Sequence, residues 1–160
     1  MDCDRRRPAV RRGSERASRC RFFWPPSDTN VLVSSLISPF GPPAQVVRMV
    51  TAGVLTLCLD ARVLTEYEEV LGRKKFYFDR DAVAAFLDYV VFPGHTVASS
   101  PLPAPLPDPK DEAFLEIALA GGAEYLVTGN GSHFPETPCA GVHVVSPAGF
   151  LAAWRRRDAT

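Results

Sequence analysis

Three carboxylates and one amide lie at positions where a folded chain could bring their oxygen atoms together. They are Asp28, Glu66, Asp111 and Asn130. Oxygen ligands of this kind are preferred by hard divalent cations such as Mg²⁺ and Mn²⁺. Carboxylates that lie close together repel one another, so a bound cation would be needed to keep all three ionised at neutral pH. The residue types therefore predict a site for Mg²⁺ or Mn²⁺.

Apolar runs and helical periodicities alternate along the chain, and their order predicts the fold that would position this site. Short β-branched or aromatic runs indicate strands at 22–24, 54–59, 95–98, 125–128 and 142–145. Amphipathic spacing indicates helices at 30–38, 44–53, 61–71, 81–91 and 111–119, and a last helix from Pro147. This alternation is typical of an α/β fold with three layers, α/β/α, around a mainly parallel sheet. Sites in such sheets form at the carboxyl ends of the strands.

Residues at the ends of two predicted helices favour these boundaries. Asp60 and Asp79 are plausible N-caps for the helices at 61–71 and 81–91. Gly72 follows the first of these helices and is a typical C-terminal residue. The next three residues are cations, which complement the negative end of the helix dipole. They are Arg73, Lys74 and Lys75.

Each candidate ligand also has a simpler structural interpretation. Asp28 could be an exposed turn residue, and Asn130 is as compatible with a left-handed turn as with a ligand. Glu66 lies beside Glu68 and Glu69, and only one of these three side chains can point inward from the predicted helix.

Asp111 has a structural alternative as well, because an aspartate that opens a helix commonly caps it. Asp108 and Glu112 are near enough in sequence to share or compete for a metal role. His133 could contact a phosphate or transfer a proton. The simpler interpretation is that it is an exposed histidine in a loop.

Four segments, taken in order, resemble the motifs of PIN domains. They begin with D-T-N-V at Asp28, L-T-E-Y-E-E-V-L at Leu64, D-P-K-D-E-A-F-L at Asp108 and Y-L-V-T-G-N at Tyr125. The closing V-V-S-P at 144–147 is similar to the last strand and helix of one subgroup. That subgroup is usually described as toxin components of toxin–antitoxin systems, related to VapC-type toxins. Order and spacing hold over about 130 residues, so the combined signal is more specific than D-T-N alone.

The resemblance implies a Mg²⁺- or Mn²⁺-dependent ribonuclease with an RNA substrate. Asp28, Glu66 and Asp111 would hold the metal and act in catalysis. Toxin-type PIN proteins are typically homodimers silenced by a cognate antitoxin protein, so both partners are expected. The residues expected to support the carboxylates are Thr29, Asn30, Thr128 and Asn130, and the candidate RNA contacts are Arg73, Lys74, Lys75 and His133.

Two departures from the family pattern bear on the site. The first strand of the family normally ends directly at the first aspartate, whereas this chain has Trp24-Pro25-Pro26-Ser27 there. Proline cannot donate a hydrogen bond to a sheet, so a central strand does not tolerate two in succession. Asn130 takes the place of the fourth acidic residue, and with one charge fewer a second metal would bind more weakly.

The N-terminal part of the chain differs from the rest in charge. Residues 1–21 have eight arginines against three acidic residues, whereas the remaining 139 residues have ten basic and fifteen acidic residues. A basic arm could contact nucleic acid, and a disordered or incorrectly assigned start is the simpler interpretation. We therefore expect a basic segment at 1–26 and a PIN-like nuclease domain at 27–157.

Composition excludes several other classes of protein. No run approaches the roughly 18 apolar residues of a membrane helix, and the basic arm lacks the apolar region of a secretory signal. The four cysteines are scattered without a C-x-x-C pair, which argues against a thiolate zinc site and favours a reducing compartment. We therefore expect a cytoplasmic protein without a membrane partner.

Two other functions are compatible with these features. One is a catalytically silent PIN-like module that binds RNA or a partner protein, favoured by Pro25-Pro26 and Asn130. The other is a structure-specific nuclease acting on DNA. A Rossmann enzyme and a serine hydrolase are both disfavoured, because the chain has neither G-x-G-x-x-G after a strand nor G-x-S-x-G.

Overall fold

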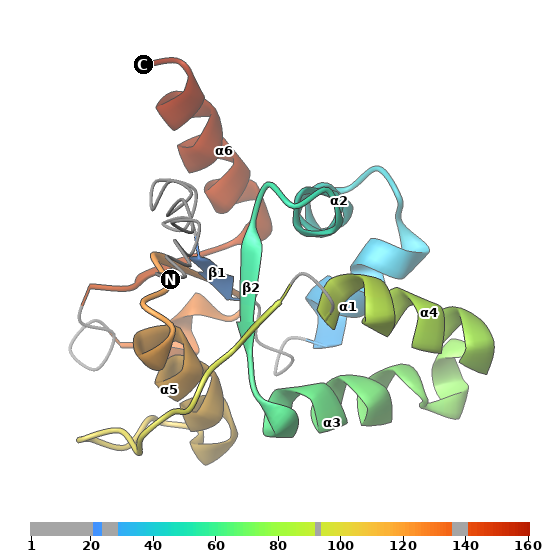
Figure 1. Cartoon of the computed structure of the whole chain (residues 1–160), viewed down its shortest axis with the longest axis horizontal. Coiled ribbons are helices and arrows are strands. Elements are labelled where there is room, and N and C mark those ends of the chain that lie inside the picture. Colours follow the sequence, from blue (N-terminus) through green and yellow to red (C-terminus); the bar gives the residue numbers. More distant parts are fainter. Residues whose placement is uncertain (1–20, 24–28, 92–93, 136–140) are drawn as a thin grey trace, which may run out of the picture.

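Five short strands and six α-helices make up the described part of the chain (Figure 1). A computed structural model describes residues 21–23, 29–91, 94–135 and 141–160. The strands are β1 (Arg21–Phe23), β2 (Thr56–Leu59), β3 (His95–Thr96), β4 (Tyr125–Val127) and β5 (His143–Val145). The helices are α1 (Thr29–Ile37), α2 (Pro42–Thr51), α3 (Ala61–Leu71), α4 (Arg80–Val91), α5 (Glu112–Ala120) and α6 (Pro147–Asp158). Three single-turn 3-10 helices are η1 (Lys74–Phe76), η2 (Pro109–Asp111) and η3 (Gly131–His133).

The strands form one sheet in the order β3-β2-β1-β4-β5, and each described pair is parallel. β1 lies at the centre, where Phe22 is opposite both Leu57 of β2 and Tyr125 of β4. The strand order reverses between β1 and β4, and ligands of open parallel sheets bind in the crevice beside such a reversal. The sheet also begins before residue 27, so β1 precedes the expected start of the domain.

Helices cover both faces of this sheet, which confirms the predicted three-layer α/β/α fold. Figure 1 shows β2 between α5 on one side and α1, α2, α3 and α4 on the other. Helix α5 contacts β1, β2 and β4, while α4 contacts β2, and α6 packs against α2. Among the described residues, no helix has both the length and the apolar character that crossing a membrane requires.

A continuous apolar core fills the space between the layers. Its largest fully buried side chains are Tyr67, Phe114, Phe150, Leu55, Leu57, Leu71, Leu115, Ile117, Leu126 and Val46. Burying a side chain such as leucine or phenylalanine contributes about 1.5–3 kcal/mol relative to leaving it in water. The core therefore holds α3 and α5 in place within their layers.

The predicted helix caps are present. Asp60 Oδ1 accepts a hydrogen bond from the Val63 N–H at 3.1 Å, and Asp79 Oδ2 accepts one from the Ala82 N–H at 3.0 Å. Each cap satisfies a backbone donor that the first turn of the helix leaves unpaired. The start of α3 is thereby fixed directly after β2.

Two strands are each two residues shorter than their apolar runs predict, and β4 and β5 are each one residue shorter. Gly53, with φ +73°, turns the chain after α2, and the N–H groups of Val54 and Leu55 both donate to the Met49 carbonyl. These two residues therefore belong to the turn, and β2 begins at Thr56. The run at 95–98 contributes only His95 and Thr96 to the sheet. The helix predicted from Asp111 begins as the 3-10 turn η2 and becomes α-helical at Glu112.

A close contact between α5 and β2 gives a prediction about stability. A Cβ atom added at Gly121 would lie 2.5 Å from Cys58 Sγ and 3.1 Å from the Ile117 carbonyl oxygen. We expect Gly121→Ala to lower the free energy of unfolding by about 1–3 kcal/mol, because the packed core cannot accept the methyl group. Chemical denaturation monitored by circular dichroism measures this change.

Two variants control for this effect. Gly131→Ala adds the same methyl group where no atom lies within 4 Å, so its stability should stay close to that of the wild type. Cys58→Ala removes the sulfur atom that the new methyl group would meet. The variant that combines Gly121→Ala with Cys58→Ala should therefore lose less unfolding free energy than the sum of the two single losses. Additive losses would show that the contact with Cys58 is not the cause.

Candidate metal centre

Asp111 is the most buried acidic residue of the described chain, with none of its surface exposed to solvent. It ends η2, which Asp108 caps by accepting a hydrogen bond from the Lys110 N–H at 3.0 Å. Pro109 occupies the first position of this turn, where its missing N–H costs nothing. In a 3-10 helix, residues three apart lie on the same side. Asp108 and Asp111 are therefore brought together by the turn itself.

The two oxygens of Asp111 have different surroundings. Its Oδ2 lies 3.0 Å from His133 Nδ1. Its Oδ1 is buried without a hydrogen-bond partner and is the sole such side-chain atom in the part of the chain that the structure describes. The carboxylate makes no capping bond to α5, so the helix-cap interpretation of Asp111 is not supported. A buried carboxylate oxygen without a partner is costly, and a bound cation would compensate it.

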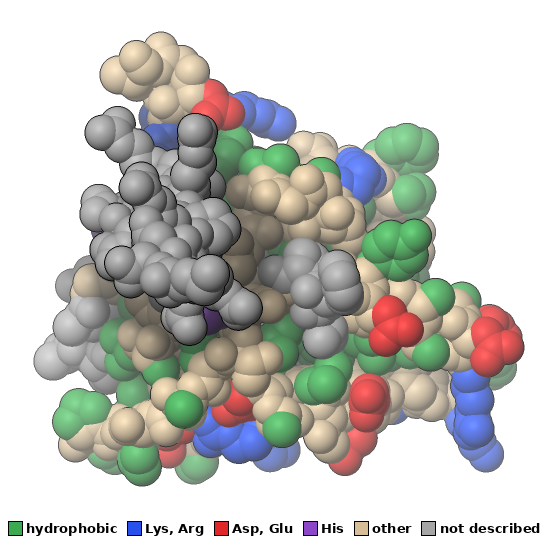
Figure 2. Space-filling view, in the orientation of Figure 1, with side chains coloured by type: hydrophobic (Ala, Val, Ile, Leu, Met, Phe, Trp, Pro, Cys, Tyr) green, Lys and Arg blue, Asp and Glu red, His purple; other side chains and the backbone are tan. Residues whose placement is uncertain are grey.

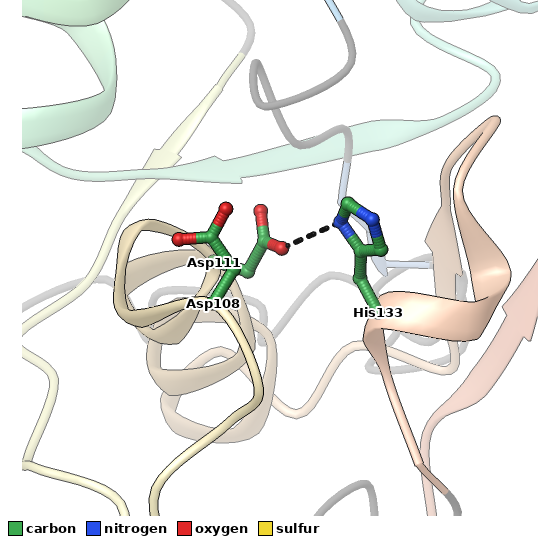
Figure 3. A group of neighbouring side chains, drawn as sticks. All are labelled: Asp108, Asp111 and His133. Carbon is green, nitrogen blue, oxygen red and sulfur yellow. Dashed lines mark hydrogen bonds and ion pairs between the residues drawn. The ribbon is translucent and has the colours of Figure 1, made fainter.

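His133 completes a group of three side chains that could hold a metal ion (Figure 3). One ligand atom from each of Asp108, Asp111 and His133 lies within 4.8 Å of the others. Figure 3 shows the two carboxylates on one turn, with the imidazole ring reaching toward them from η3. Two carboxylates and an imidazole suit a divalent cation. The carboxylates are compatible with both Mg²⁺ and Mn²⁺, and the imidazole nitrogen favours Mn²⁺ over Mg²⁺. The residues present therefore fit the expected metal.

The loop that carries His133 is fixed by three hydrogen bonds. Thr128 is buried, its N–H donates to the Val145 carbonyl at 2.8 Å, and its Oγ1 accepts from the Asn130 N–H at 3.0 Å. The Asn130 carbonyl in turn accepts from the His133 N–H at 3.0 Å. Asn130 has φ −116°, so it is not a left-handed turn residue. Thr128 and Asn130 thus hold η3 in the position that directs His133 at Asp111.

Glu66 is the least exposed of the three neighbouring acidic residues of α3, Glu66, Glu68 and Glu69. Glu68 and Glu69 are both exposed, whereas Glu66 is partly buried. Burial raises the pKa of the Glu66 carboxyl above its ordinary value, and the negative charge of Glu69 raises it further. Asp111 also raises this pKa, so the two carboxylates lie close enough to repel each other. Glu66 is nevertheless outside the three-residue group within 4.8 Å.

Two positively charged residues act on Glu66. Lys110 and Arg73 both lower the pKa of Glu66, against the effects of burial and the neighbouring acids. Lys110 belongs to η2, beside Asp111, and Arg73 precedes η1 at the end of α3. Two cations next to a group of carboxylates provide a place for an anionic substrate such as a phosphate.

An arginine connects the two helices that carry these acids. Arg62, at the start of α3, donates to Glu116 Oε2 of α5 at 3.0 Å and to Asp60 Oδ2 at 2.9 Å. It also donates to Ser99 Oγ at 2.8 Å. The hydrogen bond to Asp60 raises the pKa of Arg62, which therefore stays charged. This network links the start of α3, which carries Glu66, to α5, which follows Asp111.

The other residues predicted for the site have different outcomes. Asp28 lies outside the described residues, and Thr29 and Asn30 begin α1 with side chains that are also outside them. Glu112, a competitor for the metal role, has its Oε1 3.1 Å from the Leu106 N–H, so it serves as an acceptor for the preceding loop. Lys75 lies with its Nζ 4.8 Å from the centre of the Phe76 ring.

The structure brings Asp108 and His133 close to Asp111, although neither is among the three metal ligands predicted from the motifs. The D-P-K-D spacing could have identified Asp108, because a proline after a capping aspartate favours the turn that pairs it with Asp111. His133 has no such local signal. It is 22 residues from Asp111, and only the return of the chain through β4 brings it back to η2.

One comparison with known proteins bears on this geometry. A model of the PIN domain family matches residues 27–132, which include Glu66, Asp108 and Asp111. No curated protein and no solved structure shows a significant match to the chain. The family match covers more than half of the 160 residues and agrees with the parallel sheet and the acidic cluster at its carboxyl end. The chain therefore belongs to the PIN domain family.

Proposed function

We propose that the protein is a Mg²⁺- or Mn²⁺-dependent endoribonuclease and the toxin component of a type II toxin–antitoxin system. PIN domains are generally metal-dependent nucleases that bind nucleic acid. The observation that carries the proposal is the buried Asp111, whose Oδ1 has no hydrogen-bond partner and whose Oδ2 faces His133. RNA as the substrate and the toxin role rest on the likeness of the motifs to toxin-type PIN proteins.

Each residue of the cluster has a role in this proposal. Asp108, Asp111 and His133 would hold the metal, with Glu66 as a further ligand and Asp28 contributing as the first motif implies. The metal would supply Lewis-acid polarisation of the scissile phosphate and activation of water. Lys110 and Arg73 would hold phosphate oxygens against the repulsion of the carboxylates. The contact between His133 and Asp111 would hold the imidazole ring beside the metal.

The extent and the partners of this nuclease are also proposals. The nuclease domain would run from β1 to about residue 157, with the preceding basic segment available to contact RNA phosphates. A homodimer and silencing by a cognate antitoxin in the cytoplasm follow from the toxin assignment.

Cleavage of single-stranded RNA by the full chain tests the proposal. We expect a mixed-sequence RNA to be cut internally with Mn²⁺ and to remain intact with EDTA, as measured on a denaturing gel. Single-stranded DNA and flap DNA run in parallel should be cut much more slowly. Preferred cutting of flap DNA would identify a DNA nuclease and contradict the ribonuclease assignment.

A silent PIN-like binding module is the second candidate, and one observation favours it. β1 contains only three residues and ends at Phe23, before the residues that lead to Asp28. A full chain that binds Mn²⁺ but leaves RNA and DNA intact would select this candidate over the nuclease.

A further inference from the structure

A cavity of about 890 Å³ lies between α3 and α4, apart from the metal centre. Its apolar surface comes from both helices and from the segment between them. These residues include Leu64, Leu71, Phe78, Val83, Ala84 and Leu87. A cavity of this size and character can take a ligand with an apolar body.

The rim of the cavity is charged, with three basic and two acidic residues. The basic residues are Arg73, Lys74 and Arg80, and the acidic ones are Glu68 and Asp88. Figure 2 shows basic side chain atoms projecting into solvent at the lower right, where α3 leads into α4 in Figure 1. The rim therefore has one positive charge in excess, which favours a ligand that combines an apolar part with negative charge.

Tyr77 is the most unusual residue of this rim. Its side chain is 92% exposed, although tyrosine rings normally pack against other residues. Its backbone has φ 54° and ψ 27°, and it is the one non-glycine residue with positive φ in the described chain. This left-handed conformation is unfavourable for a residue with a Cβ atom, and such strain concentrates at functional sites. The fold thus presents an aromatic ring to solvent at the mouth of an apolar cavity.

Arg73 connects this cavity with the metal centre. It lines the cavity and lies two residues after the end of α3, the helix that carries Glu66. A polynucleotide bound at the metal centre could therefore reach the cavity along α3.

We propose that the cavity between α3 and α4 binds an unstacked base of single-stranded RNA, with Tyr77 stacked on the base and Arg73, Lys74 and Arg80 contacting the adjacent phosphates. Bases stack on exposed aromatic side chains in this way only when they are not held in a duplex. The inference rests on the proposed function for the identity of the polynucleotide. It adds a specific binding site to that function and predicts a preference for unpaired RNA.

Binding of a short fluorescently labelled single-stranded RNA to the full chain in EDTA tests this inference, because no cleavage is expected without metal. We expect Tyr77→Asn to weaken binding about 5- to 100-fold. Asparagine tolerates the left-handed conformation, so the loop should stay in place. Tyr77→Phe keeps the ring and should bind like the wild type. Tyr89→Asn is the matched control, because Tyr89 is 69% exposed on α4 but does not line the cavity.

The same assay separates base stacking from general attraction to phosphate. The plot of log affinity against log salt concentration has a negative slope. Arg73→Gln should make this slope shallower by about 0.7, which corresponds to one lost phosphate contact on a single strand. Binding of duplex RNA should be unaffected by Tyr77→Asn, because paired bases cannot reach the ring.

Several results would overturn the inference. They are absence of RNA binding by the wild type, equal binding by Tyr77→Asn, and equal losses for single-stranded and duplex RNA. Cleavage by a wild type whose binding does not depend on Tyr77 would refute the base site and leave the nuclease intact. Binding that depends on Tyr77 without cleavage under any metal would refute the nuclease and support the RNA site. A partner protein that competes for the cavity while RNA does not bind would identify a protein-docking surface instead.

Discussion

Asp111→Asn should abolish metal-dependent RNA cleavage and at the same time make the metal-free protein more stable. We expect the cleavage rate with Mn²⁺ to fall at least about 100-fold, because the variant loses the central charged ligand of the metal centre. In EDTA the free energy of unfolding should rise by about 1–3 kcal/mol. The reason is that a neutral amide costs less to bury without a partner than the charged carboxylate oxygen of Asp111 does. Cleavage kinetics and thermal unfolding of the same preparation measure the two effects.

The opposite signs of these effects distinguish a metal ligand from a structural carboxylate. A structural role for Asp111 predicts that both stability and activity fall together when it is changed. Asp158→Asn is the matched control, since Asp158 is exposed at the end of α6, and it should change neither quantity. Loss of stability in EDTA, or cleavage at the wild-type rate, would contradict the role given to Asp111.

Phe114→Ala should cause the largest loss of stability of any single substitution discussed for this chain. Phe114 is 1% exposed on α5, the helix that covers one face of the sheet and contacts three of its strands. Removing a buried phenylalanine ring costs about 3–5 kcal/mol, through lost apolar burial and the cavity that remains. Total stabilities of such domains are about 5–15 kcal/mol, so much of the stability would be lost. Urea unfolding monitored by circular dichroism measures the change.

Phe40→Ala provides the control for that experiment. It removes the same side chain at a position that is 87% exposed in the turn before α2, so its stability should stay within about 0.5 kcal/mol of the wild type. A similar loss for both variants would show that burial of Phe114 does not determine the stability of this layer.

Local signals in the sequence predict the helices better than the strands. Asp60 and Asp79 cap the helices they were expected to cap, because a capping bond depends on residues only three positions apart. The ends of the strands depend on partners far along the chain. Val54 continues an apolar run, yet its N–H donates to Met49, because Gly53 turns the chain back before the sheet begins. No local pattern distinguishes these two uses of an apolar residue.

The candidate site shows the same difference between local signals and contacts made by residues far apart in the chain. The motifs predict Glu66 and Asp111 as ligands, and whether these residues bind metal stays a prediction that the experiments above address. The approach of His133 to Asp111 could not be predicted from spacing, because it depends on the crossing of the chain through α5 and β4. The strained backbone of Tyr77 has no sequence signal either, since tyrosine is not a residue that favours a left-handed conformation.

Titration of the full chain with Mn²⁺ by isothermal calorimetry, beside Asp111→Asn, tests the central claim most directly. The account predicts saturable Mn²⁺ binding to the wild type and affinity reduced at least about 100-fold in the variant. Circular dichroism of both proteins in EDTA establishes that the variant is folded. Equal Mn²⁺ affinity for the two proteins, or no binding by the wild type, would contradict a metal centre built on Asp111.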